Sequence, residues 1–197
     1  VGADGRFAYD PAGAFDDLPA AAAATEVFAY AVSDGRGGTD AAEVTLTVAG
    51  VNDAPVAAPD AAVSEAGAPV PIPVLANDAD PDAGESPVLR RVDGRVALAG
   101  VAITLAGSGA TVTPDGAGGL LWAPPADLAA PLTDVFLYEI ADPAGAVAVG
   151  TVTVAATPPD GPPVARDDAL ALAADAGARA VDVLADNGAG PDLDPEG

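Results

Sequence analysis

The 197-residue chain carries 30 acidic side chains against 7 basic ones, and half of its residues are hydrophobic, so a folded but very acidic protein is expected. The net charge of −23 excludes nucleic acid and anionic membranes as partners, and no apolar run approaches the roughly 20 residues needed for membrane insertion. Cysteine, histidine and lysine are absent, which excludes disulfides, zinc–thiolate sites and Ser–His, Cys–His or Ser–Lys catalysis, so no enzyme is expected.

The chain repeats itself at an offset that is constant over three pairs of segments and changes by one residue for a fourth, 74–78 with 183–187. The three pairs are 25–34 with 133–142, 44–48 with 152–156, and 55–57 with 163–165. A fixed period of this kind indicates an array of one structural unit. We therefore expect three units: residues 1–53 as the C-terminal half of a repeat, 54–161 as a complete repeat, and 162–197 as the N-terminal part of a third.

Apolar residues alternate with others along several segments, which predicts β-strands. In residues 134–142, Phe136, Tyr138 and Ile140 share one face. The glycine-rich segment 35–39 lacks the lysine of a phosphate-binding loop, so it is expected to be a hairpin turn. Further strands are predicted at 44–48, 70–75, 88–92, 96–98, 101–105, 111–113 and 120–122.

About seven or eight short strands per repeat, separated by Gly, Pro and Asp, predict an all-β fold of tandem antiparallel Greek-key β-sandwich repeats. Trp122 is expected to anchor the core of the complete repeat. The alternative for Trp122 is an exposed platform on which a sugar stacks.

Four segments resemble the bacterial cadherin-like and VCBS-type immunoglobulin-like tandem repeats of large surface adhesins. They are residues 4–11, 28–40, 51–56 and 74–82. The resemblance implies cadherin- or immunoglobulin-like sandwiches in a secreted or bacterial cell-surface protein. It also implies calcium binding and a part in cell adhesion.

The loop after the strand at 70–75 has the composition of a calcium site. Asp78, Asp80 and Asp82 alternate, with Asn77 beside them, and calcium prefers six to eight oxygen ligands. An EF-hand is rejected because Ala83 replaces its glycine. The alternative is a solvated acidic turn. The third unit repeats the pattern around a proline, with Asp192, Asp194 and Glu196.

The linker Asn52–Asp53–Ala54–Pro55 resembles a cadherin linker, in which such residues share calcium with neighbouring modules. By that resemblance, Glu65 would be the acidic residue of the first strand, and Asp34 or Asp60 would lie near the junction. The second linker, 160–163, lacks the asparagine, which weakens the case for an equivalent site there. The alternative for each linker is a plain proline-stiffened connector.

These expectations combine into a calcium-binding stalk or spacer of an extracellular bacterial surface protein. Its partners would be the neighbouring repeats of the same chain, and a cell-surface or glycan ligand would be bound through other domains. Two alternatives stay open: a glycan- or protein-binding module, and an accessory non-catalytic module of a secreted hydrolase. A carboxylate-pair glycosidase would need one carboxyl in an apolar cleft, whereas the carboxylates of this chain cluster in turns.

Overall fold

The computed structural model describes residues 5–159, in which every regular element except one helical turn is a β-strand. The expected all-β fold is confirmed. The helical turn is the 3-10 turn η1 (Val74–Ala76). The strands are β1 (Ala23–Ser33), β2 (Thr39–Ala49), β3 (Asp60–Ser64), β4 (Val70–Ile72), β5 (Val88–Val92), β6 (Arg95–Val96), β7 (Ile103–Thr104), β8 (Thr111–Pro114), β9 (Leu120–Ala123), β10 (Leu132–Ala141) and β11 (Val147–Ala156).

Strands β3 to β11 form a sandwich of two sheets. One sheet has the order β3-β11-β10-β5-β6 and the other has the order β4-β9-β8-β7. The chain crosses from one sheet to the other after β3, β4, β6 and β9, which is the Greek-key connectivity expected of an immunoglobulin-like sandwich. All strand pairs are antiparallel except β3 with β11, which run parallel over five residues.

The core lies between the two sheets. Phe136, Tyr138 and Ile140 face inward from β10, as their alternation predicted, and each is at most 3% exposed. Trp122 comes from the opposite sheet and is fully buried, which confirms it as a core anchor. A buried indole cannot stack on a sugar, so the alternative role for Trp122 is excluded.

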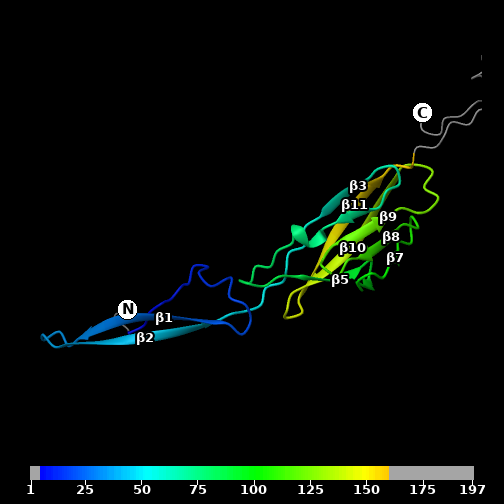
Figure 1. The fold of residues 1–197 in the computed structure, drawn as a ribbon. Coiled ribbons are helices and arrows are strands. Elements are labelled where there is room, and N and C mark those ends of the chain that lie inside the picture. Colours follow the sequence, from blue (N-terminus) through cyan, green and yellow to red (C-terminus); the bar gives the residue numbers. More distant parts are fainter. Residues whose placement is uncertain (1–4, 160–197) are drawn as a thin grey trace, which may run out of the picture.

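Strands β1 and β2 form a separate two-stranded hairpin that lies beyond one end of the sandwich (Figure 1). Phe28 pairs with Val44 in this hairpin, and Phe136 pairs with Val152 in the complete repeat. The residue numbers of the second pair exceed those of the first by the same offset that relates segments 25–34 and 133–142. The repeat in the sequence is therefore a repeat of strand register.

The structure shortens three of the predicted strands. The strand predicted at 70–75 ends at Ile72, because Pro73 has no N–H to donate to a ladder and the chain turns into η1. The strands predicted at 96–98 and 101–105 are reduced to β6 and β7, of two residues each. Both are edge strands, where short length limits unwanted pairing with other chains. The predicted turn at 35–39 does connect β1 with β2.

Candidate metal centre

The linker between the hairpin and the sandwich is attached to the long loop that joins η1 to β5. The backbone N–H of Asp53 donates to Asp82 Oδ2 at 2.9 Å. Val56 and Ala79 form a two-way backbone bridge at 2.7 and 3.2 Å. The N–H of Ala83 donates to the carbonyl of Asp17 at 2.8 Å, so the loop also contacts the first unit directly.

Acidic side chains gather at this junction. Asp80, Glu85 and Asp142 offer carboxylate oxygens that lie within 4.8 Å of one another, and these three residues could hold a metal ion. Asp80 and Glu85 come from the loop before β5, whereas Asp142 follows β10 in the turn to β11. Two neighbours complete what we call the junction cluster, which comprises Asn52, Asp80, Asp82, Glu85 and Asp142.

Several oxygens of the junction cluster are buried and lack a hydrogen-bond partner. They are Asn52 Oδ1, Asp80 Oδ2, Asp82 Oδ1 and Glu85 Oε2. Asp82 is the most informative of these residues, because its side chain is only 1% exposed. A buried carboxylate oxygen without a partner costs free energy unless a cation or a donor satisfies it. The cluster therefore has the properties of a site built for a positive charge.

Electrostatics within the cluster support the same conclusion. Burial raises the pKa of Glu85 above its ordinary value, and the negative charges of Asp82, Asp80 and Asp142 raise it further. Mutual repulsion of this kind disfavours the fully ionised state. A bound cation would reverse the effect, since it would stabilise all the carboxylates in their ionised form.

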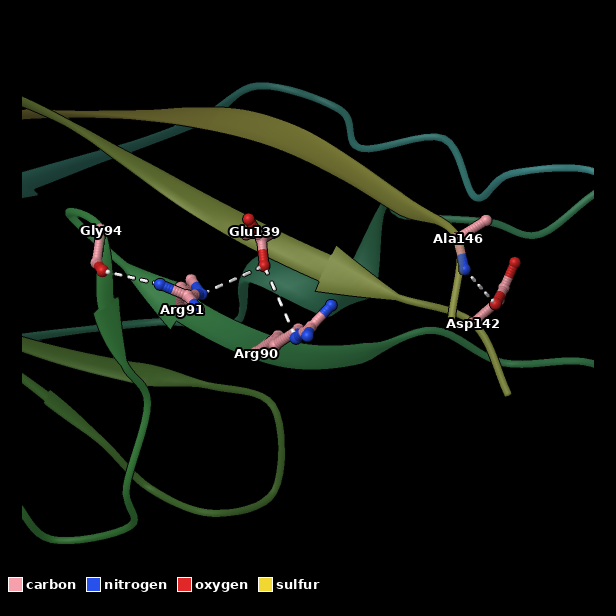
Figure 2. Close-up of polar contacts among 6 residues, drawn as sticks. All are labelled: Arg90, Arg91, Gly94, Glu139, Asp142 and Ala146. Atoms are coloured by element: carbon pink, nitrogen blue, oxygen red, sulfur yellow. Dashed lines mark hydrogen bonds and ion pairs between the residues drawn. The ribbon is translucent and has the colours of Figure 1, made fainter. Parts of the chain in front are cut away.

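Asp142 is held in place by several donors. The Asn52 side-chain amide donates to Asp142 Oδ2 at 2.8 Å and lowers the pKa of Asp142 below its ordinary value. The backbone N–H groups of Gly145 and Ala146 donate to Asp142 Oδ1 at 2.6 and 2.8 Å and act in the same direction. Figure 2 shows the contact with Ala146. Asp142 therefore stays ionised while its position is fixed by the turn between β10 and β11.

The donors fit a hard divalent cation. All the candidate ligands are oxygens, from four carboxylates and one amide, which suits calcium better than zinc or copper. They come from the linker, the loop before β5 and the turn after β10. Calcium accepts an irregular coordination geometry, so ligands from three separate segments are compatible with it.

The sequence predicted that Asp78, Asp80 and Asp82 share one loop site, but the structure does not bring all three together. Asp80 and Asp82 belong to the junction cluster, but Asp78 Oδ1 accepts from Tyr138 Oη at 2.8 Å and from the Ala58 N–H at 2.8 Å. Burial raises the pKa of Tyr138 well above its ordinary value, and Asp78 adds to the effect. The exposed side chain of Asn77 donates to the Pro59 carbonyl at 3.2 Å. Asp78 and Asn77 therefore have structural contacts of their own.

Two other predicted positions lie far from the junction. Asp34 closes the turn between β1 and β2, where its Oδ1 accepts from the N–H groups of Arg36 and Gly38 at 2.7 and 3.0 Å. The 11 paired residues of the hairpin place this turn at its other end, about 35 Å away. Of the two alternatives, Asp34 is therefore excluded, whereas Asp60 begins β3 and lies beside Asp78 and Tyr138.

Glu65 also lies away from the junction, but at the far end of the sandwich. It follows β3, and because β3 runs parallel to β11, it lies beside Thr157 at the end of the sandwich away from Asp142. The remaining predicted residues divide as follows. Asn52 is in the junction cluster, Asp53 contributes its backbone N–H, and Asp192 and Asp194 lie outside the described residues.

Sequence reasoning missed Glu85 and Asp142. Asp142 was within reach, because it ends the repeated segment 133–142 and precedes a proline in a turn. Glu85 carried no signal, since a single glutamate in a polar loop is usually solvated. Only the folding of the loop toward the turn after β10 brings Glu85 into the cluster.

The hydroxyl of Tyr138 offers a test of the polar contacts beside the cluster. Tyr138→Phe removes the hydroxyl that lies 2.6 Å from the Ala58 carbonyl and 2.8 Å from Asp78 Oδ1, so these two partly buried acceptors lose the proton that they share. We expect the free energy of unfolding to fall by about 2 kcal/mol in urea titrations. Tyr30→Phe, at the equivalent position of the hairpin, is the matched control and should change stability by less than about 0.5 kcal/mol. Equal effects of the two substitutions would contradict this account.

Comparison with known proteins agrees with the sandwich. A family model described as a bacterial Ig domain matches residues 52–155, which is more than half of the chain. No curated protein matches the chain. Domains of this family are non-catalytic structural modules typical of extracellular surface proteins. The match does not distinguish the cadherin-like or VCBS type, which stays a prediction.

Within residues 5–159, no helix is long and apolar enough to cross a membrane. The matched residues begin at the linker and end in β11, so they cover nearly all of the sandwich and every residue of the junction cluster. The chain therefore belongs to the bacterial Ig domain family.

Proposed function

We propose that this chain is a calcium-stiffened spacer segment of an extracellular bacterial surface protein. In this proposal, calcium binds the junction cluster and fixes each sandwich relative to the unit before it. The array then holds a distant adhesive domain away from the cell. The single observation that carries the proposal is the set of buried, unpartnered oxygens at the junction, above all Asp82 Oδ1.

The position of the cluster supports a mechanical role. Asn52 lies in the linker itself, and the loop that bears Asp80, Asp82 and Glu85 also contacts Asp17 of the first unit through Ala83. Without a cation, the clustered carboxylates repel one another and loosen these contacts. With calcium bound, the same groups would become ligands that connect the linker, the loop and the turn after β10.

The expected free energy of calcium binding is large relative to the total stability of a typical domain. For a dissociation constant on the order of 0.1 mM and calcium about a hundred times higher, binding stabilises the folded state by about 2.7 kcal/mol. For a domain of this size, that corresponds to a rise in Tm of roughly 10 °C or more.

The test is thermal unfolding of the full chain in EDTA, in about 10 mM calcium and in about 10 mM magnesium. Trp122 is the only tryptophan, so its fluorescence reports the complete repeat. We expect Tm to rise by roughly 10 °C in calcium and much less in magnesium, which keeps its water ligands more strongly. An unchanged Tm in calcium would refute the mechanism for this junction.

Substitutions locate the ion. Asp80→Asn with Glu85→Gln removes two carboxylates of the cluster and should abolish the calcium-dependent rise. Asp93→Asn with Asp127→Asn is the matched control, because both residues are exposed and lie outside the cluster. If the calcium-dependent rise in Tm persists in the first double variant and disappears in the control, calcium binds outside the junction cluster.

A further inference from the structure

The outer face of the five-stranded sheet is unusually apolar. Along β10, Val135 and Leu137 are 63% and 50% exposed, whereas Phe136 and Tyr138 between them are buried in the core. Val149 on β11 is 56% exposed on the same outer face, opposite Glu139. A strand that is hydrophobic on both faces is typical of one covered on both sides. The inner side of β10 is covered by the second sheet, but its outer side is not.

A β-bulge places two arginines beside this apolar strip. Glu139 pairs with Arg91 and Ile140 pairs with Leu89, so Arg90 is an extra residue without a partner in the ladder. A bulge of this kind redirects a side chain. As a result, Arg90 and Arg91 both approach Glu139 Oε1, at 3.7 and 3.5 Å, on one face of the sheet (Figure 2). We call Arg90, Arg91, Val135, Leu137, Glu139 and Val149 the arginine face.

The arginine face is exceptional in its charge. Two of the chain's seven basic residues, Arg90 and Arg91, belong to it, whereas Arg95 pairs with the buried Val92 and does not. Counted with Glu139, the arginine face carries a net charge of +1, since two positive charges meet one negative charge. The whole chain has a net charge of −23, so its copies repel one another over most of their surface. The arginine face is positively charged, so it is a part of the surface through which two copies can approach each other with less repulsion.

The guanidinium groups are only partly satisfied within the chain. The side chains of Arg90 and Arg91 are 51% and 44% exposed, and both share one carboxylate oxygen at distances beyond a good hydrogen bond. Arg91 Nη1 also donates to the Gly94 carbonyl at 3.2 Å. Each guanidinium therefore retains donors for a carboxylate from another molecule.

We infer that the arginine face is a docking surface for the same face of a second copy of this chain. Arg91 and Glu139 are cross-strand neighbours. A twofold axis running between their strands and parallel to them places the Arg91 of one copy opposite the Glu139 of the other. The pattern is thus self-complementary in charge, and Val149, which lies beside Glu139, then faces the 58% exposed Val96, which lies beside Arg91 in the other copy. The dimer does not depend on calcium at the junction.

The first unit carries a different surface at the equivalent positions. Ala29 and Ala31 stand where the complete repeat has Leu137 and Glu139, at the offset of the sequence repeat. The hairpin therefore lacks both the large apolar side chain and the acidic partner. The arginine face is a property of the complete repeat and not of the repeat pattern in general.

The test is the association of the full chain by sedimentation equilibrium in EDTA, from about 10 to 500 µM at low salt. We expect a monomer–dimer equilibrium that high salt weakens. Arg91→Glu and Glu139→Arg should each weaken dimerisation at least about tenfold, because like charges would then meet across the axis. The double variant R91E/E139R restores the self-complementary pattern and should dimerise within about threefold of the unchanged chain.

Arg36→Glu is the matched control, since it makes the same charge change in the exposed turn between β1 and β2 and should alter dimerisation less than about twofold. Val149→Ala should weaken the dimer, whereas Leu121→Ala, which is 43% exposed on β9 of the other sheet, should not. A monomer throughout the concentration range, or a double variant that fails to dimerise, would overturn the proposal. A monomer that an acidic polysaccharide retains through Arg91 would assign the face to a glycan instead.

Discussion

Trp122→Ala is expected to destabilise the complete repeat by about 4 kcal/mol, which is the usual loss when a large buried aromatic is truncated. The side chain is fully buried at the centre of the β4-β9-β8-β7 sheet, where Trp122 pairs with Val112 on one side and Val70 on the other. Its Nε1–H donates to Asp134 Oδ2 at 2.9 Å, and Asp134 is only 7% exposed. The substitution therefore leaves both a cavity and a buried carboxylate without its donor.

Leu121→Ala is the matched control for this prediction. Leu121 is the preceding residue of β9, faces outward and is 43% exposed, so its truncation should cost less than about 1 kcal/mol. Both variants are measured by circular dichroism during urea unfolding, because Trp122→Ala removes the fluorescent probe. Similar losses for the two variants would mean that the repeat does not depend on its central aromatic residue.

Gly150→Ala is expected to cost about 3 kcal/mol through overpacking rather than through a cavity. Gly150 lies on β11 directly opposite Tyr138, and a Cβ atom added to it would overlap the phenol ring. The ring cannot easily move, because Tyr138 is 1% exposed and its hydroxyl is held by Ala58 and Asp78. The hairpin has Ala42 at the equivalent position opposite Tyr30, which is less buried.

Gly107→Ala is the control for the glycine substitution, since a Cβ atom there meets no other atom within 4 Å and its φ is not positive. It should change the midpoint of urea unfolding very little, as measured by Trp122 fluorescence. A loss at position 150 no greater than at position 107 would show that the Tyr138 ring can shift without cost.

Local pattern was sufficient for most of the fold. The alternation that places Phe136, Tyr138 and Ile140 on one face predicted the inner surface of β10, because successive side chains of a strand point to opposite faces. The constant offset of the repeat predicted that Phe28 and Phe136 occupy equivalent places in two hairpins. Strand ends were less predictable: Pro73 ends β4 early, and edge pairing limits β6 and β7 to two residues each.

The candidate metal centre was only half predictable. Asp80 and Asp82 were identified because carboxylates alternate in their loop, and Asn52 because its segment resembles a cadherin linker. Asp78 was grouped with them since its spacing is the same, yet its carboxylate contacts Tyr138, which is 60 residues away. Spacing along a loop does not determine which way each side chain points, because the loop bends according to its tertiary contacts.

Composition and alternation along the chain were enough to predict an acidic, all-β protein without the side chains of most catalytic sites. Charge and composition are properties of the chain alone. Strands can be predicted because the alternation of apolar and polar residues is also local to the chain. The tertiary structure alone decided that Glu85 and Asp142 complete the junction cluster, that Asp34 and Glu65 lie away from it, and that Arg90 turns toward Glu139. These contacts join segments that are distant in sequence, and their geometry is set by sheet pairing and bulges that no local pattern encodes.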